Sequence, residues 1–157
     1  MKLYVKQKVF SFRDKFFVVD ENEREQYYVE GAISFGKKLH VYDNYKNELA
    51  CVYEKFMSFM PRYYVSQYGE VIAEIVREFS FFKPKYRIEN IGWHIEGDIF
   101  EHEYSICADQ NCIAKVSKAW FSFGDAYEID VNEEAGCDPV IALAVVLVID
   151  ACLEDNS

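Results

Sequence analysis

The feature that most constrains this chain is an uninterrupted apolar segment near its C-terminus. Ten consecutive apolar residues run from Val140 to Ile149. Asp138 is a good N-cap and Pro139 suits the first helical position, so a helix is predicted over residues 138–153. Because such a helix has no polar face to present to water, it must be enclosed by other parts of a protein or by lipid.

The length and flanks of this segment favour enclosure by protein. About fifteen residues at roughly 1.5 Å each give about 22 Å, whereas a membrane span usually needs ~20 apolar residues. Asp150 interrupts the segment, and its flanks are acidic and contain no Lys or Arg to serve as an anchor. A tail anchor is the alternative to a buried core helix. Residues 2–8 alternate instead of forming the apolar region of a signal peptide, so none is expected.

Most of the chain before this helix has the alternating pattern of β-strands, as where Leu3 and Val5 alternate with Lys2 and Tyr4. Twelve strands are predicted, over residues 2–10, 15–20, 26–34, 37–43, 48–55, 62–67, 71–79, 85–89, 93–100, 102–108, 112–120 and 126–131. Residues 71–79 would also suit a helix, but their match to other units of a repeat favours a strand. Residues 132–137 are predicted to be the loop into the helix.

Internal repeats divide the chain into two similar halves. An Ile/Leu-Ala unit followed by a Ser-Phe pair occurs three times, beginning at Leu49, Ile72 and Ile113. The segment from Val29 to Ile33 likewise matches that from Ile95 to Ile99. We therefore predict a single domain over residues 1–157, with half-repeats 1–68 and 69–131 and a central helix at 138–153. The Ser-Phe pairs are predicted to be structural, with the Phe packed and the Ser satisfying backbone groups at a bend.

The predicted helix decides between the architectures open to a mainly β chain. About twelve short antiparallel strands form either a sandwich or a barrel. A barrel of more than about eight strands has an interior too wide for its own side chains to fill. An apolar helix is a suitable filling, so the predicted fold is a closed barrel of about twelve antiparallel strands enclosing the C-terminal helix.

Charge and cysteine content narrow the class of protein. The net charge is −10, with 15 basic and 13 acidic residues in 1–90 but 2 basic and 14 acidic residues in 91–157. This acidity argues against nucleic acid as a partner, because such binding depends on neutralising phosphates. The five cysteines are an odd number without a CxxC motif, which predicts reduced thiols and a cytoplasmic location.

Several segments together resemble the LURP-one-related family of the tubby C-terminal-like superfamily, in its short bacterial form. They are the Ser-Phe pairs, the segment from Phe81 to Tyr86, the segment from Ile95 to Asp98, and the apolar run from Ala142 to Asp150. The resemblance covers nearly the whole chain and implies a closed barrel of twelve antiparallel strands around a central helix.

For function the resemblance implies less. Relatives with this fold include tubby domains, which bind phosphoinositide head groups, and phospholipid scramblases, whereas LURP-one-like members largely lack a defined activity. No tubby phosphoinositide-binding motif matches residue by residue, and the Cys-rich lipidation segment of scramblases is absent.

Four basic residues form the first candidate site. Lys83, Lys85 and Arg87 alternate and so share one strand face, and the repeat aligns Arg62 with Lys85. Beside several tyrosines they could hold a phosphate or sulfate group through charge-assisted hydrogen bonds. The alternative is a solvated strand face that discourages edge pairing.

A second, weaker candidate is a metal site formed by His94, Glu96, Asp98 and His102, although the first three lie on the strand face predicted to meet solvent. No nucleophile motif, P-loop or dinucleotide fingerprint is present, so no catalytic residue and no cofactor are predicted. The leading hypothesis is a non-enzymatic binding or scaffold module for an anionic head group, a phosphate-bearing ligand or a protein partner, without transmembrane insertion. The alternatives are a metal-dependent enzyme using the second site and a membrane-associated scramblase-like protein.

Overall fold

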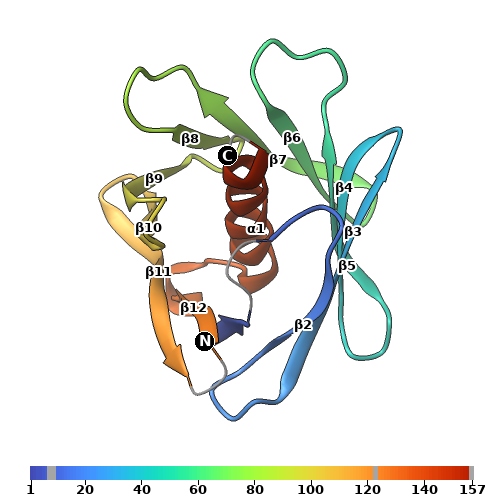
Figure 1. The fold of residues 1–157 in the computed structure, drawn as a ribbon, viewed down its shortest axis with the longest axis vertical. Helices are drawn as coiled ribbons and strands as arrows, with labels where there is room; N and C mark the ends of the chain where they lie inside the picture. The colour runs from blue at the N-terminus through green and yellow to red at the C-terminus, as the bar shows by residue number, and fades with distance from the viewer. Residues whose placement is uncertain (7–9, 122–123, 156–157) are drawn as a thin grey trace.

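Antiparallel strands form a closed barrel in the computed structural model, which describes residues 1–6, 10–121 and 124–155 (Figure 1). Each strand pairs with its neighbours in sequence, and the first pairs with the last to close the ring. The strands are β1 (Lys2–Val5), β2 (Lys15–Val19), β3 (Glu25–Ser34), β4 (Gly36–Tyr42), β5 (Glu48–Glu54), β6 (Arg62–Gln67), β7 (Glu70–Glu78), β8 (Lys85–Glu89), β9 (Trp93–Asp98), β10 (Glu103–Ala108), β11 (Asn111–Phe121) and β12 (Gly124–Val131). This twelve-stranded barrel confirms the predicted fold.

Each predicted strand has a counterpart, including β7, for which a helix was the rival interpretation. The first prediction was too long, because β1 ends at Val5 and residues 7–9 lie outside the described part of the chain. The prediction that a strand begins at His102 was also wrong. His102 has a left-handed backbone with a φ of 52° in the turn between β9 and β10, and β10 begins one residue later.

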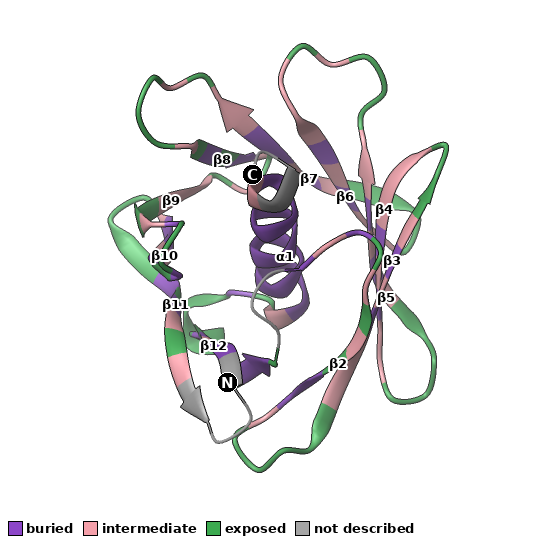
Figure 2. Cartoon of the chain, viewed as in Figure 1, coloured by how far each residue is buried: buried purple, intermediate pink, exposed green. Residues whose placement is uncertain are grey.

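The helix α1 (Pro139–Asp155) runs through the middle of the barrel, where Figure 2 shows it as buried. Every residue from Ala142 to Asp150 is fully buried. Asp138 caps the helix as predicted, since its Oδ1 accepts a hydrogen bond of 2.9 Å from the backbone N–H of Val140. Enclosure by the barrel leaves this helix unavailable as a tail anchor. Within the described ranges, no helix has the length and apolar character needed to cross a membrane.

Two glycines that the repeat aligns are both places of close backbone approach. A Cβ on Gly31 of β3 would lie 2.5 Å from the carbonyl oxygen of Phe12, and one on Gly97 of β9 would lie 2.6 Å from that of Glu103. Gly97 also has a φ of 117°, which side-chain-bearing residues rarely adopt. Glycine at these positions therefore lets the backbone of Phe12 approach β3 closely and the backbone of β10 approach β9 closely.

Because neighbouring strands run in opposite directions, the loops between them lie alternately at the two ends of the barrel. The loops that leave odd-numbered strands gather at one end, and those that leave even-numbered strands gather at the other. The C-terminus of α1 lies at the first end, beside β7 and β8 (Figure 1). We call this first end the aromatic end, after the side chains of its loops at residues 35, 55–61, 79–84 and 99–102.

Candidate functional site

Large apolar side chains are exposed at the aromatic end to an unusual degree. Among the described residues, eight Phe and Met side chains are between 58% and 100% exposed, and all eight lie in its loops: Phe35, Phe56, Met57, Phe59, Phe79, Phe81, Phe82 and Phe100. The other large apolar residues exposed by more than half are two tyrosines at the opposite end, Tyr45 and Tyr68. Single exposed apolar residues are ordinary, but a concentration on one end marks an interaction surface.

Most of these residues come from two adjacent loops. The β5–β6 loop spans residues 55–61 and the β7–β8 loop spans residues 79–84, and each carries a Pro near its end. Phe79 and Phe81 contact each other edge to face, with ring centroids 5.0 Å apart. The prediction that the Phe of each Ser-Phe pair packs was wrong for Phe59 and Phe81, which are exposed, whereas Phe12 of the similar pair Ser11-Phe12 near the N-terminus is buried. The pair at residues 122–123 lies outside the described chain.

Charge is divided between the two ends of the barrel. The segments 33–39, 55–63 and 79–88, which contain or flank the aromatic loops, hold seven basic residues and no acidic residue. The connections 20–24, 43–47, 109–110 and 132–138 at the opposite end hold eight acidic and two basic residues. The β9–β10 loop of the aromatic end adds the acidic Glu101, so the positive charge of that end is concentrated around the β3–β4, β5–β6 and β7–β8 loops. The net charge of −10 therefore conceals a basic, apolar part of the aromatic end and an acidic opposite end.

Two of the four predicted anion-binding residues are joined in a network of ion pairs. Arg62 on β6 and Arg87 on β8 lie opposite the same residue of β7, Val76. Arg62 bonds the carboxylate of Glu74 and lies 3.2 Å from Glu89, which Arg87 also contacts, at 2.8 Å. The hydrogen bond from Arg87 lowers the pKa of Glu89. Both guanidinium groups are thus partly neutralised.

The other two predicted residues lie at the exposed rim. Lys83 is in the β7–β8 loop and Lys85 begins β8, and both are exposed, as is Lys55 in the neighbouring loop. In the described part of the chain, no ion pair involves these three lysines. Between the two loops is a hollow of about 380 Å³, whose charged lining residues are Arg62, Arg77, Glu78 and Arg87. The structure thus places Arg62 and Arg87 in the lining of a hollow, and Lys83 and Lys85 at exposed positions outside that lining.

The four residues of the predicted metal site do not form one group. His94 and Glu96 lie together on β9, with 2.9 Å between Nε2 and Oε1. Asp98 instead accepts a hydrogen bond from the backbone N–H of Glu101 and so stabilises the β9–β10 turn. His102 points into the barrel and is 8% exposed.

Sequence reasoning missed a buried polar cluster around the end of α1. Asp150 is fully buried, and its carboxylate lies 2.8 Å from Nε2 of His102 and accepts a bond of 2.6 Å from the Tyr127 hydroxyl. The rings of His102 and Tyr127 are stacked with centroids 4.6 Å apart. The signal that could have revealed this cluster is the lone acidic residue in an apolar helix, since a buried carboxylate requires partners.

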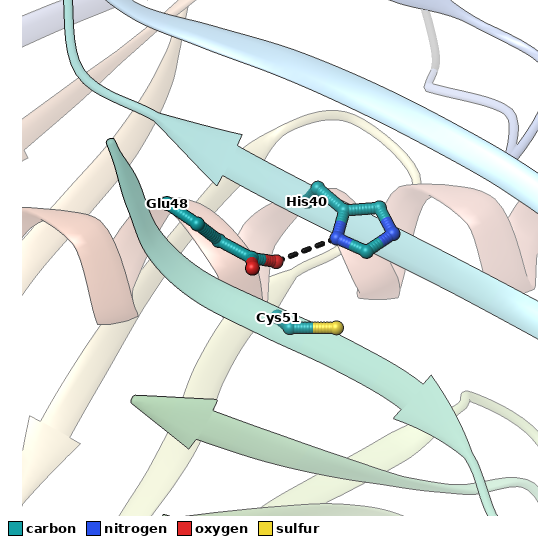
Figure 3. A group of neighbouring side chains, drawn as sticks. All are labelled: His40, Glu48 and Cys51. Atoms are coloured by element: carbon teal, nitrogen blue, oxygen red, sulfur yellow. Dashed lines mark hydrogen bonds and ion pairs between the residues drawn. The ribbon is translucent and has the colours of Figure 1, made fainter. Parts of the chain in front are cut away.

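Two groups of nitrogen, oxygen and sulfur donors lie on the outer barrel surface. One consists of His40, Glu48 and Cys51 on β4 and β5, with Nδ1 of His40 2.6 Å from Oε1 of Glu48 (Figure 3). The other consists of His94, Glu96 and Cys107. In each group the donor atoms lie within 4.8 Å of one another. Burial and the neighbouring Cys112 raise the pKa of Cys107 to about 12.

Known proteins resemble this chain in sequence and in fold. A model of the LURP-one-related family matches residues 1–150. The uncharacterised protein YxjI of Bacillus subtilis (strain 168) is 36% identical over 161 residues, which cover 100% of this chain and 98% of that protein. The X-ray structure of a protein from Arabidopsis thaliana has a TM-score of 0.58 at 13% identity and covers 93% of this chain and 88% of its own, which shows a shared fold.

Proposed function

This chain belongs to the LURP-one-related family, and from that premise we propose that it is a non-enzymatic module that docks on anionic phospholipid surfaces through the aromatic end of its barrel. The observation that supports the proposal most is the gathering of eight exposed Phe and Met side chains, with a basic surround, at one end. Interfacial membrane binding depends on this combination of apolar area and positive charge.

The two kinds of residue contribute separately to docking. A Phe or Met side chain contributes roughly 1.5–3 kcal/mol when it is fully buried in an apolar medium, and partial insertion contributes less. Each Lys near an anionic leaflet contributes about 1 kcal/mol. The side chains of Lys55, Lys83 and Lys85 are exposed in or next to the loops that carry the exposed Phe and Met residues. Apolar insertion and electrostatic attraction therefore act at the same surface. A barrel that approached with its acidic end foremost would be repelled by the same leaflet, which favours docking by the aromatic end.

The hollow between the β5–β6 and β7–β8 loops gives this surface a place for one head-group phosphate. Arg62, Arg77 and Arg87 line it, and Glu78 is its one acidic lining residue. A phosphate entering the hollow would take over hydrogen bonds that Arg62 and Arg87 now donate to carboxylates. We assign the arginines to head-group contact and the lysines to general attraction.

A binding function is also consistent with the interior of the barrel. Small-molecule active sites are usually concave and partly apolar cavities. Here α1 occupies the interior of the barrel, and its residues from Ala142 to Asp150 are fully buried. The outer surface and loops are therefore the places where a ligand can meet this chain.

The test is co-sedimentation with vesicles of phosphatidylcholine alone and of phosphatidylcholine mixed with phosphatidylglycerol. We expect binding to the mixed vesicles, and a loss of most of it in the double variant Phe59→Ser/Phe81→Ser and in the triple variant Lys55→Glu/Lys83→Glu/Lys85→Glu. The matched control is Tyr45→Ser/Tyr68→Ser at the opposite end, which should bind as the unmodified protein does.

Two outcomes would contradict the proposal. One is equal sedimentation of the loop variants and the unmodified protein. The other is an absence of binding to mixed vesicles by a folded, monodisperse protein, which would favour a protein partner for the aromatic end. Competition by soluble glycerol phosphate separates the sources of phosphate, because a free phosphate ligand would displace the vesicles whereas a surface interaction would persist.

A further inference from the structure

Four metal-ligating side chains converge on the outer face of three adjacent strands, β9, β10 and β11. Cys107 lies directly opposite His94 on one side and Cys112 on the other. Glu96 follows His94 by two residues and so shares its strand face. These residues lie toward the acidic end of the barrel, near the β8–β9 and β10–β11 turns, and are separate from the aromatic loops.

Three of the four donor atoms lie close together, and the fourth, the sulfur of Cys112, contacts this group through Cys107. The sulfur atoms of Cys107 and Cys112 are 2.9 Å apart, and Nε2 of His94 is 2.9 Å from Oε1 of Glu96. The donors of His94, Glu96 and Cys107 all lie within 4.8 Å of one another. In a tetrahedral zinc site with bonds of about 2.3 Å, two sulfur atoms are about 3.8 Å apart. Small side-chain rotations would therefore open room for an ion.

We propose that His94, Glu96, Cys107 and Cys112 bind a borderline-soft divalent metal ion of the Zn²⁺ class. Two sulfurs, an imidazole nitrogen and a carboxylate oxygen suit such an ion, whereas Mg²⁺ and Ca²⁺ prefer sites made of oxygen alone. Cys107 is 2% exposed and Cys112 is exposed, so the site is closed beneath and open to entry from solvent.

The other donor group provides a comparison within the same molecule. His40, Glu48 and Cys51 also lie close together, but they offer a single sulfur. Cys51 lies opposite His40 on β4 and opposite Ser66 on β6, so no second thiol faces it across either strand. The group on β9 to β11 has the additional thiol of Cys112 and is the stronger site. The strand ladders hold its backbone in place, so binding requires side-chain movement alone.

The test is a titration of the reduced protein with Co²⁺, a spectroscopic substitute for Zn²⁺ that shows thiolate-to-metal charge-transfer absorption. We expect one Co²⁺ per chain, thiolate bands, and displacement of Co²⁺ by Zn²⁺. The bands should be lost in Cys107→Ser/Cys112→Ser. His94→Ala should weaken binding by at least about tenfold, the effect that even supporting residues have at metal sites. Cys51→Ser is the matched control and should titrate as the unmodified protein does.

Two results would overturn the proposal. One is the absence of thiolate bands in the fully reduced, folded protein. The other is their persistence in the folded double cysteine variant, which would assign the ion to another group such as that of His40. Oxidation with a thiol oxidant adds a further check, because a disulfide between Cys107 and Cys112 should abolish binding and reduction should restore it. None of these readouts depends on vesicle binding.

Discussion

Replacing Tyr127 by Phe would remove one of the two hydrogen bonds that hold the buried carboxylate of Asp150. The Tyr127 hydroxyl donates to this carboxylate at 2.6 Å, and His102 makes the other contact at 2.8 Å. A Phe ring keeps the shape of the side chain and its stacking on His102, so the change isolates the hydroxyl. Hydrogen bonds to charged groups contribute about 1.5–3 kcal/mol to stability.

A matched control lies on the neighbouring strand β10. Tyr104 is also buried, but its hydroxyl has no hydrogen-bond partner among the described residues. Tyr104→Phe removes a buried polar group of this kind, so the free energy of unfolding should stay the same or rise. Both substitutions delete a buried tyrosine hydroxyl oxygen, and the structure predicts a loss of stability only where that hydroxyl has a partner.

The assay is thermal and urea unfolding of both variants beside the unmodified protein. One kcal/mol corresponds to about 2–4 °C in a domain of this size, so Tyr127→Phe should lower the Tm by about 3–12 °C. The Tm of Tyr104→Phe should be equal to or above that of the unmodified protein. Equal losses in the two variants would refute the reasoning, because they would show that the cost of Tyr127→Phe does not come from the hydrogen bond to Asp150.

Three further outcomes follow from burial and backbone geometry. Burial raises the pKa of Tyr104 and Tyr127 well above about 10, so their protons are retained in the folded state while the unfolded chain loses them. Burial also raises the pKa of Cys107 from its ordinary value near 9, so stability against urea should begin to fall above about pH 9. Above about pH 10 the two tyrosines alone should add a fall of about 2.7 kcal/mol per pH unit, and a flat profile to pH 11 would contradict this. Leu147→Asp places an unpaired carboxylate in the fully buried part of α1, so we expect no folded protein, and a melting curve like that of the unmodified chain would refute the core placement. Gly31→Ala and Gly97→Ala should each lower the Tm, with the larger loss at Gly97 because its positive φ adds backbone strain, and unchanged melting of both would show that the neighbouring backbone can move.

The barrel could be predicted from the sequence because each of its parts has a local pattern. Strand alternation identified the segments, and the apolar run from Val140 to Ile149 required an enclosure wide enough to hold a helix. Strand ends were less accurate where the chain turns through unusual backbone conformations. His102 was grouped with the outward-facing residues of β9 in the predicted metal site, but it has a left-handed backbone in the turn and its side chain is buried, which residue spacing alone does not reveal.

The candidate sites were harder to predict because they depend on which strands are neighbours and on their register. Cys107 and Cys112 are five residues apart, but their contact requires the β10–β11 pairing with its irregularity after Ile106. Asp150 meets a histidine 48 residues away. The aromatic loops were misread for a different reason, since a Phe in a sequence usually indicates packing, and only the closed barrel shows that Phe59 and Phe81 extend beyond it.

The division of charge explains how an acidic protein could dock on an anionic surface. The helix α1 has 17 residues and runs from the acidic end to the aromatic end, which separates the two by about 25 Å at 1.5 Å per residue. At physiological ionic strength the Debye length is about 8 Å, so a leaflet at the aromatic end is screened from the acidic connections roughly three lengths away. The charge that such a leaflet meets is that of the nearby loops, where Lys55, Lys83 and Lys85 are exposed. Net charge is therefore a poor guide to the partner of this barrel, and the local arrangement of lysine and phenylalanine is the better one.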